Sequence, residues 1–492
     1  MTPFGPWLPD VMKFNPSVST EARNVIPPST SGFGPFPSFN NVTSAITARV
    51  QGAFSARGLT GTIYNFAGDV SKLYQMANDG LSFNDVSRVS GGAYTTASDA
   101  WWQFAQFGDY VMAVNQADDS QVFQMSASTN FAAMAGSPPR AAFCGSIRDF
   151  AVLARVSTNF NRIQWSGIND ITAWTPSSTT MSDYQDFPDG GVIKGFVGGE
   201  YGVVLQERAI QRMAFEGPPL IFRFDKISNT LGCQIETSIA SYENLIFFKA
   251  HDGFYMIRGG SEIVPIGVEK VDKWFAENVD ASFFDRCSAA IDPSRKLYLI
   301  GFPSTSATSG LPDRVLMYHW PSGEWSYAVI DHELLYTSAT QSSYTIDGLA
   351  SLSATIDGLT YPVDSLFYSG SGQLLLSGFD SSHRQGFFTG QNLEARIETG
   401  EVQLTQGRKS LLRSVRPMLE ASGATPTVTI RYRDRLQDAV NDGPAVAANS
   451  NGVCFVRHNA RYHRARTTIP AGETWTRALG IDDINFSSMG AR

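Results

Sequence analysis

A short apolar segment that follows a polar residue recurs along the middle of the chain, and this repeat constrains the fold more than any other feature. Five copies start 40, 51, 44 and 52 residues apart. They are DYVMAV (109–114), DFAVLA (149–154), EYGVVL (200–205), NLIFF (244–248) and KLYLIGF (296–302). A repeat at a fixed period indicates an architecture built from one supersecondary unit.

Each copy is followed by a turn rich in Asn, Asp, Ser or Gly and then by a second strand-like segment, so the predicted unit is a β-hairpin. The second segments are SQVFQM (120–125), RIQWSG (162–167), AIQRMAF (209–215), GFYMIRGG (253–260) and RVLMYHW (314–320). Because the first segment of each hairpin is almost wholly apolar, we expect it to be buried on both faces as the inner strand of its unit.

Weaker copies at 62–76 and 364–379 bring the series to about seven units. A β-propeller of six to eight blades has this period and leaves only short strand edges exposed. A β-sandwich stays open as the alternative, although it does not require a near-constant spacing. We also expect one short helix at 267–279, where apolar residues recur at helical spacing.

The chain divides into three predicted regions. Residues 1–45 contain eight prolines and no sustained period, so we expect an extended arm that docks on a surface. Residues 46–390 form the propeller. Residues 391–492 contain further strand-like segments and form a β-sandwich of about 100 residues. The overall fold class is therefore all-β.

Composition and charge exclude several classes of protein. Charged residues make up only 17% of the chain, and 44 glycines and 24 prolines favour turns over long helices. The net charge is -8, so the chain lacks the basic character of proteins that bind nucleic acid through its phosphates. The four cysteines lie at least 54 residues apart, which argues against a zinc site or a disulfide framework. No apolar run is long enough to span a membrane, and we expect folding in a reducing cytoplasm.

Motifs for catalysis are mostly missing. His332 and Glu333 begin a zinc-binding pattern, but Tyr336 stands where the second histidine belongs. The carboxylates of DYQDFPDGG (183–191) lack calcium-loop spacing and are interpreted as a solvated turn. We therefore predict no catalytic residue, no metal ion and no cofactor. A propeller glycosidase remains an alternative, because paired carboxylates need no local motif. The tryptophans 165, 174, 320 and 325 are interpreted as core residues rather than sugar platforms.

Arginine dominates the C-terminal region. Residues 395–492 hold 14 Lys and Arg against 9 Asp and Glu, and 13 of the 14 cations are arginine. Alternation places several of them on common strand faces. These faces are either solvated or form a basic interface for an acidic partner subunit, and arginine suits desolvated ion pairs. The predicted interface residues are Arg431, Arg433, Arg435, Arg461, Arg464 and Arg466.

Several segments resemble the tail-nozzle or tail-hub proteins of short-tailed bacteriophages, including the packaged-DNA-stabilisation group. They are GFGPFP (32–37), CGSIRDFAVLAR (144–155) with the following RIQWSGINDITAW, residues 227–275, and RYHRARTTIPAGETWTRALGIDDI (461–484). The similarity covers most of the chain and lies in pattern and order rather than in one diagnostic motif.

The resemblance implies a structural protein of the virion, made in the bacterial host cytoplasm, and not an enzyme. It implies a homo-hexameric ring that forms the lower tail tube, contacts an adaptor protein, a tail fibre or spike and a plug or needle protein, and retains and conducts duplex DNA without sequence-specific binding. The alternative is a propeller carbohydrate-active enzyme or a receptor-binding tail protein.

Overall fold

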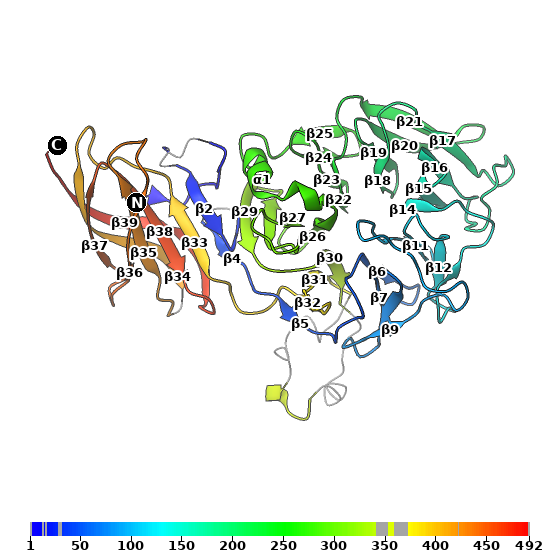
Figure 1. Cartoon of the computed structure of the whole chain (residues 1–492), viewed down its shortest axis with the longest axis horizontal. Coiled ribbons are helices and arrows are strands. Elements are labelled where there is room, and N and C mark those ends of the chain that lie inside the picture. The colour runs from blue at the N-terminus through cyan, green and yellow to red at the C-terminus, as the bar shows by residue number, and fades with distance from the viewer. Residues whose placement is uncertain are drawn as a thin grey trace.

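Seven small antiparallel units of four strands follow one another along the middle of the chain (Figure 1). The computed structural model describes residues 2–11, 14, 17–27, 32–340, 353–358, 372–421 and 423–490. Six units are separate sheets, and the sixth along the chain is the first part of a nine-stranded sheet. The repeat seen in the sequence is therefore a repeat of whole four-stranded units.

The first unit consists of β6 (Ala53–Arg57), β7 (Ile63–Gly68), β8 (Leu73–Met76) and β9 (Phe83–Asp85), and the second of β10 (Gln103–Phe107), β11 (Tyr110–Val114), β12 (Gln121–Gln124) and β13 (Ala132–Ala133). The third consists of β14 (Ala141–Ile147), β15 (Phe150–Val156), β16 (Asn159–Trp165) and β17 (Asp183–Asp186). The fourth consists of β18 (Ile193–Val197), β19 (Gly202–Gln206), β20 (Ile210–Gly217) and β21 (Ile221–Ser228).

The fifth unit consists of β22 (Ile235–Tyr242), β23 (Leu245–Lys249), β24 (Phe254–Arg258) and β25 (Glu262–Pro265). The sixth consists of β26 (Ser288–Asp292), β27 (Leu297–Phe302), β28 (Arg314–His319) and β29 (Glu324–Val329). The seventh consists of β30 (Leu334–Ala339), β31 (Leu374–Phe379), β32 (Gln385–Phe387) and β5 (Asn40–Asn41). The arm thus supplies the outermost strand of the seventh unit.

All five strong hairpins predicted from the sequence are present, as β11–β12, β15–β16, β19–β20, β23–β24 and β27–β28. The weaker hairpin at 62–76 is β7–β8. Of the copy predicted at 364–379, residues 364–371 lie outside the described residues. The three predicted core tryptophans 165, 174 and 325 are buried, and Trp320 is half-buried.

The apolar strands are not the innermost strands of their units, which corrects the sequence-based prediction. Each is the second strand, buried on both faces between neighbouring sheets; all residues of β19 and β27 are buried. The innermost strand precedes it, as β10 precedes β11. Innermost strands line a hollow centre with a mixture of small, polar and aromatic residues, such as Gly145, Ser146 and Phe104. Because of this mixed composition, the innermost strands lack the apolar run that marks the second strands in the sequence.

The innermost strands contact one another in chain order, and β30 of the seventh unit contacts β6 of the first. Together the seven strands surround one cavity of about 440 Å³. The arrangement is therefore propeller-like, with small sheets grouped about a common centre.

The C-terminal region forms two further groups of strands beside the propeller-like ring (Figure 1). One is a sheet in the order β1 (Thr2–Pro3), β39 (Trp475–Ser488), β34 (Ser410–Ala421) and β37 (Cys454–Ala460). The other continues the nine-stranded sheet beyond β29 with β2 (Ser19–Arg23), β33 (Ala395–Thr399), β38 (Tyr462–Ile469), β35 (Thr427–Arg433) and β36 (Asn441–Ala447). Side chains from both groups, such as Val415 and Ile430, share one buried cluster.

The N-terminal arm is extended, as predicted, but the surface on which it docks belongs to its own chain. β2 pairs with β29 on one side and with β33 on the other. β3 (Val25–Ile26) pairs with β4 (Gly34–Pro35). Trp7, Phe33 and Phe36 are fully buried. The arm therefore joins the propeller-like ring to the C-terminal strands through backbone pairing, with one residue pair on the β29 side, Arg23 opposite Tyr327, and four on the β33 side.

Helical structure is sparse in the described residues: α1 (Asp272–Asn278) and two 3₁₀ segments, η1 (Ala281–Arg286) and η2 (Ile356–Gly358). α1 is shorter than the predicted helix, and its Phe275 is buried in the main core. None of the helices in the described part of the chain has the length and apolar character needed to cross a membrane.

Candidate functional site

The predicted interface arginines lie mostly on two neighbouring strands of the nine-stranded sheet. β35 pairs with β38 so that Arg431 stands opposite Arg464 and Thr429 opposite Arg466. On its other side β38 pairs with β33, which places Glu398 opposite Arg466. The predicted alternation is therefore correct, and the sheet brings a carboxylate to the arginine face that the local sequence did not reveal.

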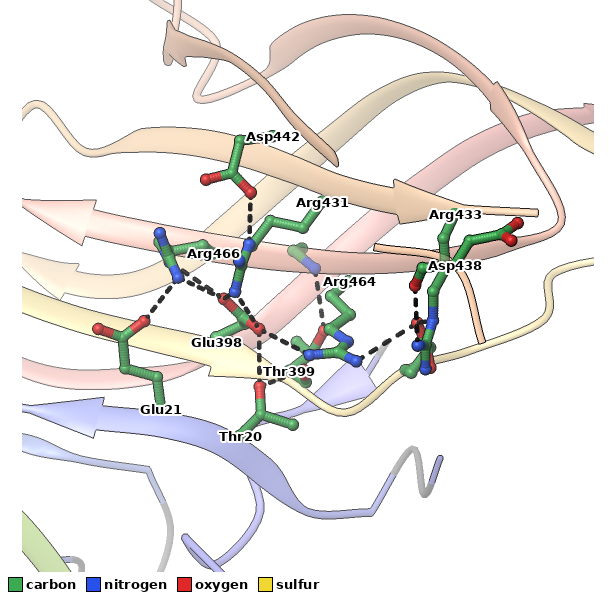
Figure 2. A network of polar contacts seen from close by, with 12 residues as sticks. Thr20, Glu21, Glu398, Thr399, Arg431, Arg433, Asp438, Asp442, Arg464 and Arg466 are labelled. Carbon is green, nitrogen blue, oxygen red and sulfur yellow. Dashed lines mark hydrogen bonds and ion pairs between the residues drawn. The ribbon is translucent and has the colours of Figure 1, made fainter. Parts of the chain in front are cut away.

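Glu398 is the centre of an ion-pair network (Figure 2). Its carboxylate accepts hydrogen bonds from Arg431 at 3.0 Å, from Arg464 at 3.4 Å and from Nε of Arg466 at 3.0 Å. A terminal NH₂ group of Arg466 forms a further ion pair with it at 2.9 Å. The hydroxyl of Thr20 in the arm donates a further bond of 2.9 Å. Only 2% of the Glu398 side chain is exposed, so these bonds replace almost all of its hydration.

A second buried carboxylate, Glu401, lies on the chain just beyond β33. Nε of Arg433 donates to it at 2.8 Å, and Arg464 lies 3.4 Å away. Arg464 thus contacts both glutamates, and its side chain is 6% exposed. Asp442 on β36 pairs with Arg431 at 2.6 Å and raises the pKa of that guanidinium, against the opposing effect of burial.

The arm adds a fourth carboxylate to the network. Glu21 on β2 lies 3.0 Å from Arg466. Burial raises the pKa of the Glu21 carboxyl, and Arg466 opposes that rise. Four guanidinium groups therefore meet four carboxylates within one chain, a neutral set in which arginine is suited to bidentate and desolvated pairing.

This geometry gives four of the six arginines ion-pair partners within their own chain. Arg431, Arg433, Arg464 and Arg466 neither form a solvated face nor stand unpaired for a partner subunit, because glutamates distant in sequence neutralise them. Arg435 is exposed and Arg461 is half-buried, and the structure gives neither an ion pair within the described residues. Contact of any of the six with a partner subunit stays a prediction.

Residues considered for metal binding or catalysis have structural partners. Burial lowers the pKa of His332 to about 4, and Glu333 accepts hydrogen bonds from the Val50 amide and His383. The segment 183–186, predicted to be a turn, is the edge strand β17. Within the described ranges, no three His, Cys, Asp or Glu side chains come close enough to hold a metal ion.

The central cavity contains one conspicuous charged group. Glu236 on β22 lines it, pairs with Arg155, and lies 3.1 Å from Lys194. The rest of the lining combines backbone at residues such as Gly198 with aromatic rings such as Phe104. The carboxylate is thus held between two cations.

A buried carboxylate lies at the start of α1. Oδ1 of Asp272 accepts a hydrogen bond of 3.0 Å from the Phe254 amide, while Oδ2 is buried without a hydrogen-bond partner. Burial raises the pKa of Asp272 from 3.8 to about 6, an effect that the Phe254 bond and nearby Lys249 oppose. The folded protein therefore holds this proton more tightly than the unfolded chain does.

We expect Asp272→Asn to become progressively more stable relative to the wild type as pH rises from about 4 to about 6. In that window the folded wild type retains a proton that the unfolded chain has lost, so its unfolding free energy falls with rising pH. Asparagine keeps the oxygen that accepts from Phe254 and does not titrate. Chemical denaturation of both proteins across this range measures the difference, and a difference independent of pH would contradict the assignment.

Comparisons with known proteins were made for the whole chain. No protein-family model matches it, and no curated protein matches it. Similar solved structures include the extracellular domain of BT4673 from B. thetaiotaomicron, at 9% identity and TM-score 0.43, covering 83% of this chain and 47% of that one. They also include YCF48 bound to D1 peptide, at 10% identity and TM-score 0.35, covering 60% and 87%. The chain thus spans about half the length of the BT4673 domain.

Proposed function

We propose that this chain is a structural subunit of a short-tailed phage tail, in which six copies form the nozzle of the lower tail tube. The observation that carries the proposal is the junction of arm, ring and C-terminal strands. β2 joins β29 to β33, so two large parts of the chain share one nine-stranded sheet. Such a junction, in which β2 bridges the ring and the C-terminal strands, suits a wall component that must keep its shape. The resemblance of the sequence to tail-nozzle proteins indicates that this wall is the tail tube.

The fold that we propose is a closed seven-bladed β-propeller with a C-terminal β-sandwich. Contact between β30 and β6 and the single cavity lined by all seven innermost strands support closure. The shared cluster between the two C-terminal groups of strands supports the sandwich. The boundaries at residues 45 and 390 are part of this proposal.

In the proposed assembly the nozzle binds an adaptor above it and a fibre, spike, plug or needle protein around or below it. Six chains carry a net charge of about -48, which repels the phosphates of duplex DNA passing through the tube. Of the acidic turn at 115–121, Asp118 is held inside the chain by Arg88 and the Thr95 amide, whereas Asp119 is 63% exposed beside Arg140.

We expect the purified protein to show negligible affinity for duplex DNA at about 0.15 M salt, because its net charge of -8 repels the phosphates and salt screens the attraction of local basic groups. Fluorescence anisotropy with two duplexes of unrelated sequence measures this. Any binding at low salt should be equal for the two duplexes. Tight binding at about 0.15 M salt would contradict a non-adhesive tube.

Cryo-electron microscopy of virions that carry an epitope tag on this chain tests the proposed function. The expected result is a ring of six copies at the distal end of the tail tube. A virion without the protein, or with a single copy, would overturn the proposal. Hydrolysis of host polysaccharide by the purified protein would favour the carbohydrate-active alternative.

A further inference from the structure

The basic surplus of the C-terminal region is concentrated in a few arginines. Once the network around Glu398 and Glu401 is complete, five arginines within the described residues form no ion pair at 4 Å or less. They are Arg408, Arg413, Arg435, Arg457 and Arg461. Together with the exposed ring of Phe455, we call these residues the basic patch.

Strand register brings the basic patch together at one end of the C-terminal strands. Ser410 at the start of β34 pairs with Ala460 at the end of β37, which places Arg408 near Arg461. Arg433 at the end of β35 pairs with Tyr462 at the start of β38, which brings Arg435 to the same end.

Two members of the patch, Arg413 and Arg457, lie level on adjacent strands. β34 and β37 pair Leu412 with His458 and Ser414 with Phe455, so these arginines fall between the same two pairs. Both are exposed, while Leu412 and Val456 point into the core. Phe455, two residues from Arg457 on the same face, is 66% exposed. Adjacent like charges are unfavourable, and a carboxylate brought between them would relieve the repulsion.

Lys409, Asp434 and Asp438 lie within the same end of the strands. Lys409 pairs with Asp434 at 2.7 Å, and Asp438 accepts a bond of 3.0 Å from the Arg435 amide. Among the residues that the structure describes here, six cations therefore face two carboxylates. Arginine beside an exposed aromatic ring is the composition enriched in protein interfaces, whereas charge alone is not.

The same chain carries carboxylates at successive turns of the ring. Asp149, Glu200 and Glu243 occupy the turns that lead from innermost to second strand in the third, fourth and fifth units, and all three are exposed. Within the described ranges, one cation forms an ion pair with these three carboxylates: Arg148 pairs with Glu200. The Arg148 amide donates to the Gly199 carbonyl at 3.0 Å, so the first two turns adjoin. We call these three residues the acidic turns.

We propose that the basic patch of one copy docks on the acidic turns of a second copy. This inference rests on the proposed ring of six and names the surfaces that would build it. The two surfaces are different parts of the chain, so the contact is head-to-tail and can close into a ring. A second copy is favoured over duplex DNA as occupant because residues 1–394 carry a net charge of about -13 against about +5 for residues 395–492.

Charge reversal in the full chain tests the docking. Arg413→Glu combined with Arg457→Glu should weaken self-association at least about tenfold, because like charges would then face each other across the contact. Adding Asp149→Arg and Glu243→Arg to the same chain should restore association. The matched control is Arg57→Glu combined with Arg208→Glu, which reverses two exposed arginines of the ring that form no ion pair in the described structure and should leave association unchanged.

Mass photometry at about 0.05 and 0.3 M salt reads the assemblies, and circular dichroism checks that each variant is folded. Wild-type association should weaken at the higher salt. Unchanged association of the Arg413/Arg457 variant, failure of the second pair to rescue, or a wild type that stays monomeric at both salt concentrations would overturn the inference. The inference would also be overturned if the only defect of the Arg413/Arg457 variant were a loss of DNA binding at low salt. If wild-type virions contain the ring and the Arg413/Arg457 variant still enters it, the docking inference fails while the proposed function stands. If the wild-type protein is absent from virions, the proposed function itself is overturned.

Discussion

Replacing Glu398 with alanine is expected to lower the unfolding free energy by about 3–5 kcal/mol, the range for removing one partner of a buried ion pair. The change removes the carboxylate shared by Arg431, Arg464 and Arg466. Arg464 would be destabilised most, because its side chain is only 6% exposed and its contact with Glu401 at 3.4 Å would be the one ion pair left to it in the described structure. Water cannot replace the lost partner without opening the sheet.

Glu394→Ala is the matched control for this prediction. Glu394 lies just before β33 and pairs with Arg396 at 2.8 Å, but both side chains are more than a third exposed. An exposed pair contributes about 0–1 kcal/mol. Urea denaturation of both variants at pH 7 compares them. Equal losses would show that the network around Glu398 behaves as a surface pair.

Trp7→Ala is expected to cost about 3–5 kcal/mol, the range for truncating a buried tryptophan. Trp7 is 1% exposed, and its ring lies 4.9 Å from that of Trp274 on α1 and 5.1 Å from that of Tyr327 on β29, measured between centroids. The cavity left behind would loosen the arm where it crosses the ring. We therefore expect faster proteolytic cleavage within residues 1–27 as well as a lower melting temperature.

Phe14→Ala serves as the control for the arm. Phe14 contacts Tyr462 edge to face at 5.5 Å between centroids but is 43% exposed, so its loss should cost about 1 kcal/mol or less. Limited proteolysis and thermal denaturation should separate the two variants. If Trp7→Ala behaved like Phe14→Ala, the arm would not be anchored through its buried tryptophan.

The hairpins could be predicted from sequence because the information that specifies them is local. DYVMAV and SQVFQM, for example, show an apolar run, a polar turn and an alternating run within 17 residues, and they form β11 and β12. In contrast, β34 was missed, since Pro417 and several bulges interrupt its pattern although it lies between two partner strands. The innermost strands were missed for a related reason, because the residues that face the hollow centre mix glycine and serine with aromatic side chains and give no continuous apolar run.

What the sequence by itself determined is therefore the all-β class, the repeat and its hairpins, and the same-face placement of alternating arginines such as Arg464 and Arg466. Only the tertiary structure decided what those arginines do. Glu398 is 66 residues from Arg464 and 33 from Arg431, and Glu21 comes from the opposite end of the chain. An ion pair depends on distance in space, and no local pattern encodes which strand will pair with which. The tertiary structure likewise left Arg413 and Arg457 without carboxylates, and so identified the cations that remain available to a partner.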